Sequence, residues 1–255
     1  MKLGCNDSPP LRHLLDRGSA EVDYFKVSSL TNLEPDITSA LAYRPVLVHV
    51  GFGIGDSAAS YADFDWAWFN AQLRRAGSPH TAMHVEVSTH NWPTTTDLRF
   101  QTRDEVRAMA SHLSELCLVL RDRLEVPLLL ENMDYMGREL KPGYGVFRTS
   151  VEPALLWGLV EGMGVDAQAF ARALPLHAVR ELHVSGPSFV EGVGLRDDHQ
   201  ELSEADYALL EWTLERTNAQ VLTLEYPKAR TRHGTFDEQT EALKRQLSRL
   251  RQLTT

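Results

Sequence analysis

Short, mainly apolar runs that end in a histidine or a carboxylate recur along this chain and constrain its fold more than any other feature. In the clearest of them, Leu128–Glu131, three leucines lead directly into a glutamate. Such a run is typical of a strand that is buried on both faces, as in a parallel sheet. Comparable runs lead to His49, His84, His183 and Glu225. The sequence therefore predicts parallel strands with polar side chains at their C-terminal ends.

Segments with helical spacing separate these strands, and this alternation predicts βα units around a parallel sheet. The 255 residues are close to the size of one α/β (β/α)8 TIM barrel, so we expect a single domain over residues 1–255. A doubly wound sheet is less well supported, because Gly51–Gly55 lacks the GxGxxG spacing of a dinucleotide site. Strands are expected at Met1–Cys5, Val22–Ser28, Pro45–Val50, Thr81–Val87, Leu128–Glu131, Val179–Val184 and Gln220–Glu225.

One βα unit is incomplete. After the strand that ends at Glu131, a helix is expected over Pro153–Glu161, and a second helix over Asp166–Leu174 follows almost at once. A βα repeat needs a strand between two such helices. The sequence offers none near Gly164-Val165, so it predicts seven barrel strands with one strand-containing segment missing at that point.

Composition excludes several classes of protein. The net charge of −9 argues against sequence-independent nucleic-acid binding, which needs a basic footprint. No apolar stretch approaches the length of a membrane span, and the N-terminal residues lack the apolar core of a secretory signal. The two cysteines, Cys5 and Cys117, are far apart and suit a reducing compartment. We therefore expect a cytoplasmic protein with neither nucleic acid nor membrane as a partner.

The polar side chains at the strand ends would converge at one mouth of a barrel. Converging carboxylates repel one another unless a cation compensates their charge. Mixed histidine and carboxylate ligands suit iron, manganese or zinc, and this many ligands would serve two or three ions. A histidine or glutamate alone at a strand end is more often structural, but their joint occurrence favours a metal site. The candidate ligands are His49, His84, Glu131, His183, Glu225 and a D-x-H pair, Asp197 and His199, expected on a βα loop.

Two further side chains are candidates for a supporting role. Asn132 would either ligate the metal or hold Glu131 in place, and Glu86 is two residues beyond His84, on the same face of its strand. His80 lies at no strand end, and we expect it to be a surface or packing residue.

Six motifs taken together resemble one family, the multinuclear non-haem iron-dependent oxidative enzymes, over about Val22 to Tyr226. This family includes oxidases of methanobactin biosynthesis and is a branch of the xylose-isomerase-like TIM barrels, formerly known only as a domain of unknown function. The motifs are HVGFGIG, MHVEV, LLLENM, ELHVSGPS, RDDH and TLEY, which begin at His49, Met83, Leu128, Glu181, Arg196 and Thr223.

The resemblance implies two or three iron ions at the barrel mouth and an oxidation that uses O2. Its substrate would be a ribosomally made peptide or a small molecule, and a partner protein would present the peptide. The residues that match the family's metal-ligand positions are His49, His84, Glu131, His183, Asp197, His199 and Glu225.

This chain departs from the family pattern at two points. The family's strand with an Asp ligand is absent where Gly162–Val165 leads directly into Asp166. Lys26 lies on a strand where the family often carries an acidic residue, and a lysine at the mouth would repel a metal ion. Both departures bear on how many ions the site holds.

Two other hypotheses remain open from the sequence. One is a sugar isomerase or epimerase, or a relative of the apurinic endonucleases, which would use Mn or Zn and no O2. The acidic net charge disfavours the endonuclease. The other is a degenerate, non-catalytic barrel that lost a strand and serves as a binding partner.

Overall fold

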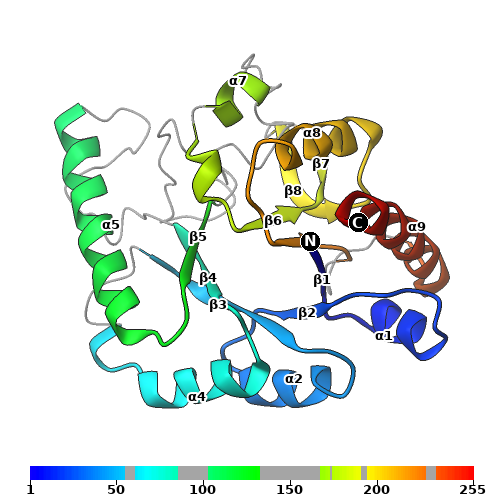
Figure 1. Cartoon of the computed structure of the whole chain (residues 1–255), viewed down its shortest axis with the longest axis horizontal. Coiled ribbons are helices and arrows are strands. Elements are labelled where there is room, and N and C mark those ends of the chain that lie inside the picture. Colours follow the sequence, from blue (N-terminus) through cyan, green and yellow to red (C-terminus); the bar gives the residue numbers. More distant parts are fainter. Residues whose placement is uncertain (55–60, 86–102, 133–166, 173, 191–193, 228–233) are drawn as a thin grey trace.

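The computed structural model describes residues 1–54, 61–85, 103–132, 167–172, 174–190, 194–227 and 234–255. Strands and helices alternate through these ranges, as the sequence predicts (Figure 1). The strands are β1 (Lys2–Asn6), β2 (Tyr24–Val27), β3 (Val46–Ile54), β4 (Thr81–Val85), β5 (Leu128–Asn132), β6 (Glu181–Val184), β7 (Gly186–Val190), β8 (Gly194–Gln200) and β9 (Val221–Leu224). The helices are α1 (Pro9–Asp16), α2 (Leu33–Ala40), α4 (Trp66–Ala76), α5 (Arg103–Arg123), α7 (Ala167–Arg172), α8 (Glu204–Leu214) and α9 (Phe236–Thr254), with a 3-10 turn at Leu176–Ala178.

Seven of the strands form one parallel sheet in the order β5-β4-β3-β2-β1-β9-β6. The sheet curves into a nearly closed barrel, and the helices lie around its outside (Figure 1). This confirms the predicted TIM-barrel-like architecture, and the seven strands are those expected from the apolar runs. Since parallel strands share a direction, all seven C-terminal ends meet at one mouth.

The barrel has one unsealed seam, between β5 and β6, which are the two outer strands of the sheet order among the described residues. A cavity of about 150 Å³ lies at this seam, with Leu129, Leu182 and Leu209 in its lining. The missing strand was predicted near Gly164-Val165, which lies outside the described residues. Because Gly164-Val165 lies between β5 and β6 in the sequence, the predicted missing strand would belong at the seam between these two strands.

Successive side chains of each strand point to opposite faces of the sheet, so one set enters the core between sheet and helices and the other enters the barrel interior. On β9, Leu222 and Leu224 are fully buried in the outer core that the helices cover. Thr223 and Glu225 therefore face inward. The interior is close-packed around Gly4 and Thr223. A Cβ atom added to Gly4 would lie only 2.7 Å from Thr223 Oγ1, so there is no room for a side chain there.

Local signals begin and end the outer helices. Asp65 accepts a hydrogen bond from the backbone N–H of Trp68 at the start of α4, and Gly77 ends that helix with a φ of 65°. Ser203 and Asp206 form a capping box at the start of α8. Among the described residues, no helix combines the length and apolar character needed to cross a membrane.

The structure corrects two details of the prediction. Strand β3 continues through the glycine-rich segment to Ile54 instead of ending at Val50. Asp197 and His199 lie in the connection between β6 and α8, as predicted, but this connection forms an antiparallel β7–β8 hairpin that has both residues on β8. The polar sequence GLRDDHQ has no apolar run to indicate a strand, and backbone pairing with β7 is what makes it one.

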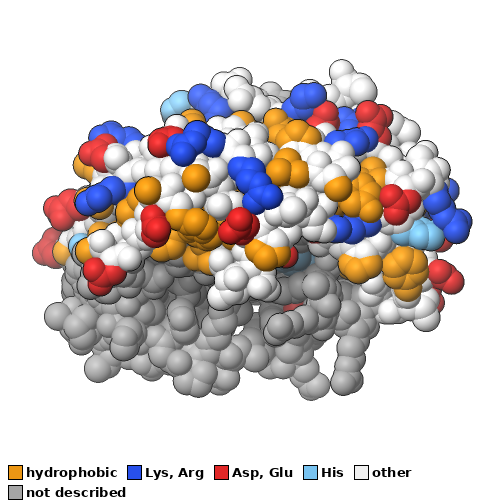
Figure 2. Space-filling model, turned by 90° about the horizontal axis from the view of Figure 1, so that it is seen from below, with side chains coloured by type: hydrophobic (Ala, Val, Ile, Leu, Met, Phe, Trp, Pro, Cys, Tyr) orange, Lys and Arg blue, Asp and Glu red, His pale blue; other side chains and the backbone are white. Residues whose placement is uncertain are grey.

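The outer surface is mixed in charge. Figure 2 views the molecule from the side where α2 and α4 lie in Figure 1, and there acidic and basic side chains alternate with small hydrophobic patches. The described part of this face carries no extended basic area of the kind that follows a nucleic-acid backbone.

Candidate metal centre

The candidate ligands come from five strands: four lie at or just after a C-terminal strand end, and His49 lies in the middle of β3, which continues to Ile54. His49 lies on β3, His84 on β4, Glu131 on β5 and His183 on β6, and Glu225 directly follows β9. His84 and Glu131 are paired residues in the β4–β5 register, so their side chains leave the sheet at the same level. The backbone N–H of Glu225 donates to the carbonyl of Val184, which continues the ladder and fixes this carboxylate beside β6.

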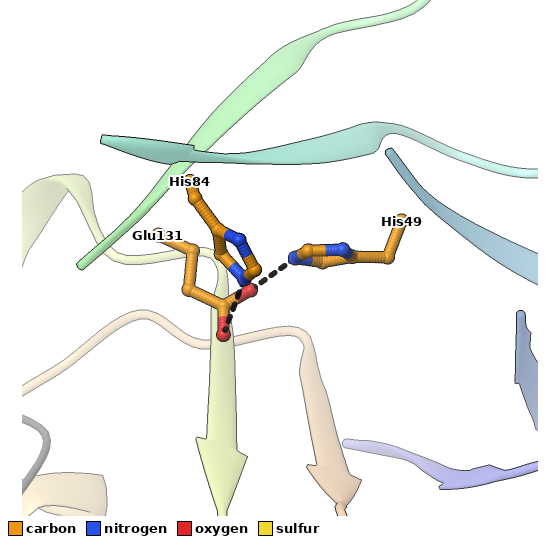
Figure 3. Close-up of side chains that lie close together, drawn as sticks. All are labelled: His49, His84 and Glu131. Atoms are coloured by element: carbon orange, nitrogen blue, oxygen red, sulfur yellow. Dashed lines mark hydrogen bonds and ion pairs between the residues drawn. The ribbon is translucent and has the colours of Figure 1, made fainter. Parts of the chain in front are cut away.

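His49, His84 and Glu131, here called the His49 set, point toward one another (Figure 3). Glu131 Oε2 lies 2.5 Å from His49 Nε2, and Glu131 Oε1 lies 3.9 Å from His84 Nε2. The two imidazole centroids are 4.5 Å apart. Each residue offers one ligand atom, and these atoms all lie within 4.8 Å of one another. A metal ion with ligand bonds of about 2.0–2.2 Å fits between atoms at this spacing.

Glu131 also belongs to a second group, the Glu225 set, which is completed by His183 and Glu225. His183 Nδ1 lies 2.9 Å from Glu131 Oε1 and 3.6 Å from Glu225 Oε1. Because Glu131 is on β5 and His183 is on β6, this ion pair crosses the seam of the barrel. Glu131 is therefore shared between the two groups.

Lys26 extends from β2 into the Glu225 set. Its Nζ donates a hydrogen bond to Glu225 Oε1 and lies 3.4 Å from His183 Nδ1. The side chain is only 5% exposed. The sequence left open whether this lysine faces the mouth, and the structure places its ammonium among the candidate ligands.

The imidazoles of the His49 set favour the neutral form. Burial lowers the pKa of His84 to about 4, and neighbouring His49 adds to that effect. Burial and the charge of Lys26 lower the pKa of His49. Histidine ligates metal ions as neutral imidazole, so both rings are held in the form that binds.

The groups of the Glu225 set are charged. Burial opposes the charge of His183, but Glu131, Glu181 and Glu225 outweigh it and raise the pKa of that imidazole to about 10. Burial also opposes the charge of Glu225, yet Lys26 and His183 lower its pKa. Burial would raise the pKa of Glu131, but His183 and Lys26 keep it well below its usual range. These carboxylates are compensated by cations that the protein itself supplies.

The other predicted site residues have varied placements. His199 Nε2 lies 3.5 Å from Glu225 Oε2, and its backbone has a φ of 52°, which is uncommon outside glycine. The side chains of Asp197 and Asn132 lie outside the described part of the structure, as does Glu86 entirely. The structure thus brings six of the seven predicted ligands together, namely His49, His84, Glu131, His183, His199 and Glu225.

Sequence reasoning missed a layer of support beneath His183. Glu181 Oε1 lies 3.1 Å from His183 Nε2 and accepts a hydrogen bond from Thr223 Oγ1 at 2.5 Å. The other oxygen of Glu181 lies 2.6 Å from Nε2 of His80, a buried residue, so a packing role alone does not describe that histidine. The signal was available for Glu181, since it is two residues before His183 on the same strand face.

Comparisons with known proteins identify the fold and no narrower group. No protein-family model matches the chain, and no curated protein does. A xylose isomerase domain containing protein from Salmonella typhimurium matches with a TM-score of 0.62 and 13% identity, over 98% of this chain and 97% of that one. The IolI protein, solved with a bound zinc atom, matches with a TM-score of 0.61 and 12% identity, over 100% and 98%. The fold is that of the xylose-isomerase-like TIM barrels.

An epimerase has the same fold. The 3-keto-D-glucoside 4-epimerase of E. coli matches with a TM-score of 0.50 and 15% identity, over 98% of this chain and 99% of the epimerase. All three structures align with this chain along almost their full lengths.

Proposed function

We propose that this chain is a divalent-metal enzyme that isomerises or epimerises a small polyhydroxylated carbonyl compound at the mouth of its barrel. The observation that carries the proposal is the His49 set. Two neutral imidazoles and one carboxylate offer ligand atoms within 4.8 Å of one another, at the barrel end where TIM-barrel enzymes have their active sites.

The xylose-isomerase-like relatives support this class of reaction over an oxidation. One of them is an epimerase of a keto sugar, and another was solved with zinc. At identities of 12 to 15% these structures share the fold with this chain, so they favour a reaction class without naming a substrate.

The residues around the set suggest how protons would move. A bound divalent ion would polarise a carbonyl oxygen and acidify the adjacent C–H group. His199, whose Nε2 lies 3.5 Å from Glu225 Oε2, is our candidate for the group that would transfer the proton. His84 is the most exposed residue of the set, with a side chain 29% exposed.

A second candidate function is the iron-dependent oxidation implied by the sequence resemblance. The specific observation in its favour is the composition of the His49 set, two histidines and one carboxylate, which is the ligand set of many non-haem iron(II) oxygenases. Under this candidate the substrate is a peptide or small molecule, and a partner protein presents the peptide.

One experiment separates the two candidates. The protein is purified anaerobically and loaded separately with Zn(II), Mn(II) and Fe(II). Each form is incubated in D2O with a panel of aldoses, ketoses and keto-glycosides, and deuterium incorporation is followed by NMR while an electrode records O2. We expect metal-dependent deuterium exchange with no O2 uptake.

Matched variants locate the activity. His84→Asn should abolish exchange, whereas His112→Asn, on helix α5, should leave it unchanged. Iron-dependent O2 uptake that is lost in His84→Asn would instead establish the oxidative candidate. A protein that retains no metal after loading would contradict both.

A further inference from the structure

Lys26 is a charged side chain at the mouth that the proposed function does not use. Its ammonium lies among the atoms that would bind a metal in the Glu225 set. Nζ donates to Glu225 Oε1 and is 3.4 Å from His183 Nδ1. These are the same two atoms that lie 3.6 Å apart in the Glu225 set. The lysine therefore lies where a second metal ion would have to bind.

We propose that the Lys26 ammonium permanently replaces a second metal ion, so that the chain binds one metal, in the His49 set, beside a built-in organic cation. The inference rests on the proposed function for the existence of the first metal, and it goes beyond that function in assigning the metal count and the reason for it.

Charge and space exclude joint occupation. A divalent ion bound to Glu225 Oε1 and His183 Nδ1 would lie within a few ångströms of the ammonium, in a buried site where like charges repel strongly. Glu225 and His183 are themselves nearly enclosed, with side chains 9% and 10% exposed. The two cations are thus alternatives.

The fold holds the backbone of Lys26 in place. Strand β2 is paired on both sides, where Lys26 lies opposite Asn6 of β1 and Leu47 of β3. Its neighbours Phe25 and Val27 are buried in the outer core. The fold therefore fixes the backbone of Lys26 and directs its side chain into the barrel interior, within reach of Glu225 and His183.

The His49 set has no direct contact with the ammonium among the described residues, although the charge of Lys26 also acts on His49. None of the hydrogen bonds or ion pairs found among the described residues joins Lys26 to His49 or His84. The set keeps its own ligand atoms within 4.8 Å and shares only Glu131 with the occupied half. One metal ion can therefore bind there while the lysine stays in place.

Metal stoichiometry tests the proposal. Wild type, Lys26→Met and Lys26→Arg are each reconstituted anaerobically with excess Zn(II) or Fe(II), desalted, and measured for metal per chain by mass spectrometry. We expect about one equivalent in wild type, about two in Lys26→Met, and about one in Lys26→Arg, which keeps a cation. Circular dichroism checks that each variant is folded.

Double variants assign the ions. In Lys26→Met, adding Glu225→Gln should remove the second ion alone, and adding His84→Asn should remove the first alone. Two equivalents in wild type, or one equivalent in folded Lys26→Met, overturns the proposal while the proposed function stands. If Lys26→Met does not fold, the wild-type count decides.

If the His49 set binds no metal, so that the proposed function fails, the metal content of the variants differs from the outcomes above. Wild type without metal and Lys26→Met with one equivalent, lost on Glu225→Gln, would show that the lysine excludes a metal but that the His49 set binds none. No metal in either protein overturns both proposals.

Discussion

The two halves of the candidate site use the same shared carboxylate in opposite ways. In the His49 set, Glu131 faces two imidazoles that burial keeps neutral, with the pKa of His84 lowered to about 4. In the Glu225 set, the same Glu131 faces a charged imidazole, with the pKa of His183 raised to about 10, next to the ammonium of Lys26. The His49 set thus has neutral imidazoles that suit a metal ion from solution, whereas the Glu225 set already contains the cations of Lys26 and His183.

The difference shows that a cluster of metal-ligating residue types does not by itself define a metal count. Carboxylates in a buried cluster need compensating charge, and an ammonium or an imidazolium supplies it as well as an ion does. Under our proposal, only the His49 half has ligands left to bind a metal.

The largest expected effect is on stability in the Glu225 half. Glu225→Gln leaves the ammonium of Lys26 buried without its carboxylate, and should lower the free energy of unfolding of the metal-free protein by roughly 3–5 kcal/mol, measured by urea denaturation. Lys26→Met combined with Glu225→Gln should be less destabilised than Glu225→Gln alone. The control is Lys2→Met, which breaks an exposed pair with Asp23 and should cost less than about 1 kcal/mol. A double variant that loses the sum of the single effects would refute the pairing.

The next effect is on metal affinity in the His49 half. Glu131→Ala removes the carboxylate of that set and should raise the Kd for Zn(II) by more than about 100-fold, or about 2.8 kcal/mol, measured by competition with a chelator. Glu125→Ala, which removes an exposed carboxylate paired with Arg74, should leave the Kd unchanged. Equal affinities in the two variants would mean that the His49 set is not the metal site.

The two halves should also differ in the pH range over which each stabilises the metal-free protein. Between pH 6.5 and about 4 the unfolded chain binds a proton at His84 that the folded chain does not, so stability falls as the pH falls. Between pH 6.5 and about 10 the folded chain keeps a proton on His183 that the unfolded chain loses, so stability falls as the pH rises.

Urea denaturation across this range measures both limbs. His84→Asn should flatten the acid limb and leave the alkaline limb, and His183→Asn should do the reverse. If His84→Asn changed the alkaline limb, or His183→Asn changed the acid limb, the two histidines would not have the protonation states assigned to them above.

The smallest effect concerns the support beneath His183. Glu181→Gln removes one of the carboxylates that raise the pKa of His183, so this pKa should move down toward its ordinary value in an NMR titration of the imidazole. Thr223→Val removes a hydrogen bond to Glu181 but keeps the charge, and should shift the pKa less. The Kd for Zn(II) should change by less than about 10-fold in both, because neither residue touches His49 or His84. A loss of affinity as large as that of Glu131→Ala would make Glu181 part of the metal site.

Much of this arrangement could be predicted from the sequence, because it depends on local patterns. The apolar runs indicated the seven parallel strands, and their last polar residues lie at one end of the barrel by the geometry of parallel sheets. The capping box of α8 and the terminal Gly77 of α4 were equally local. The ligand role of these strand-end residues stays a prediction.

What the sequence did not reveal depends on contacts between distant residues. The ion pair of Lys26 and Glu225 joins positions 199 residues apart, and no spacing rule indicates it. The β7–β8 hairpin lacks an apolar run and is held by backbone pairing. His80 lies before its strand, yet it meets Glu181 across 101 residues because both side chains enter the same barrel interior.

The seam between β5 and β6 gives the site a mechanical role. No ladder of hydrogen bonds joins these two strands in the described structure, and the ion pair of Glu131 with His183 bridges the gap instead. Among the described residues, this ion pair is therefore a contact between the two outer strands that depends on the charge of Glu131. Any ligand that draws on that charge will loosen or tighten the wall of the barrel, so amide hydrogen exchange along β5 and β6 should report occupancy of the site even before a substrate is known.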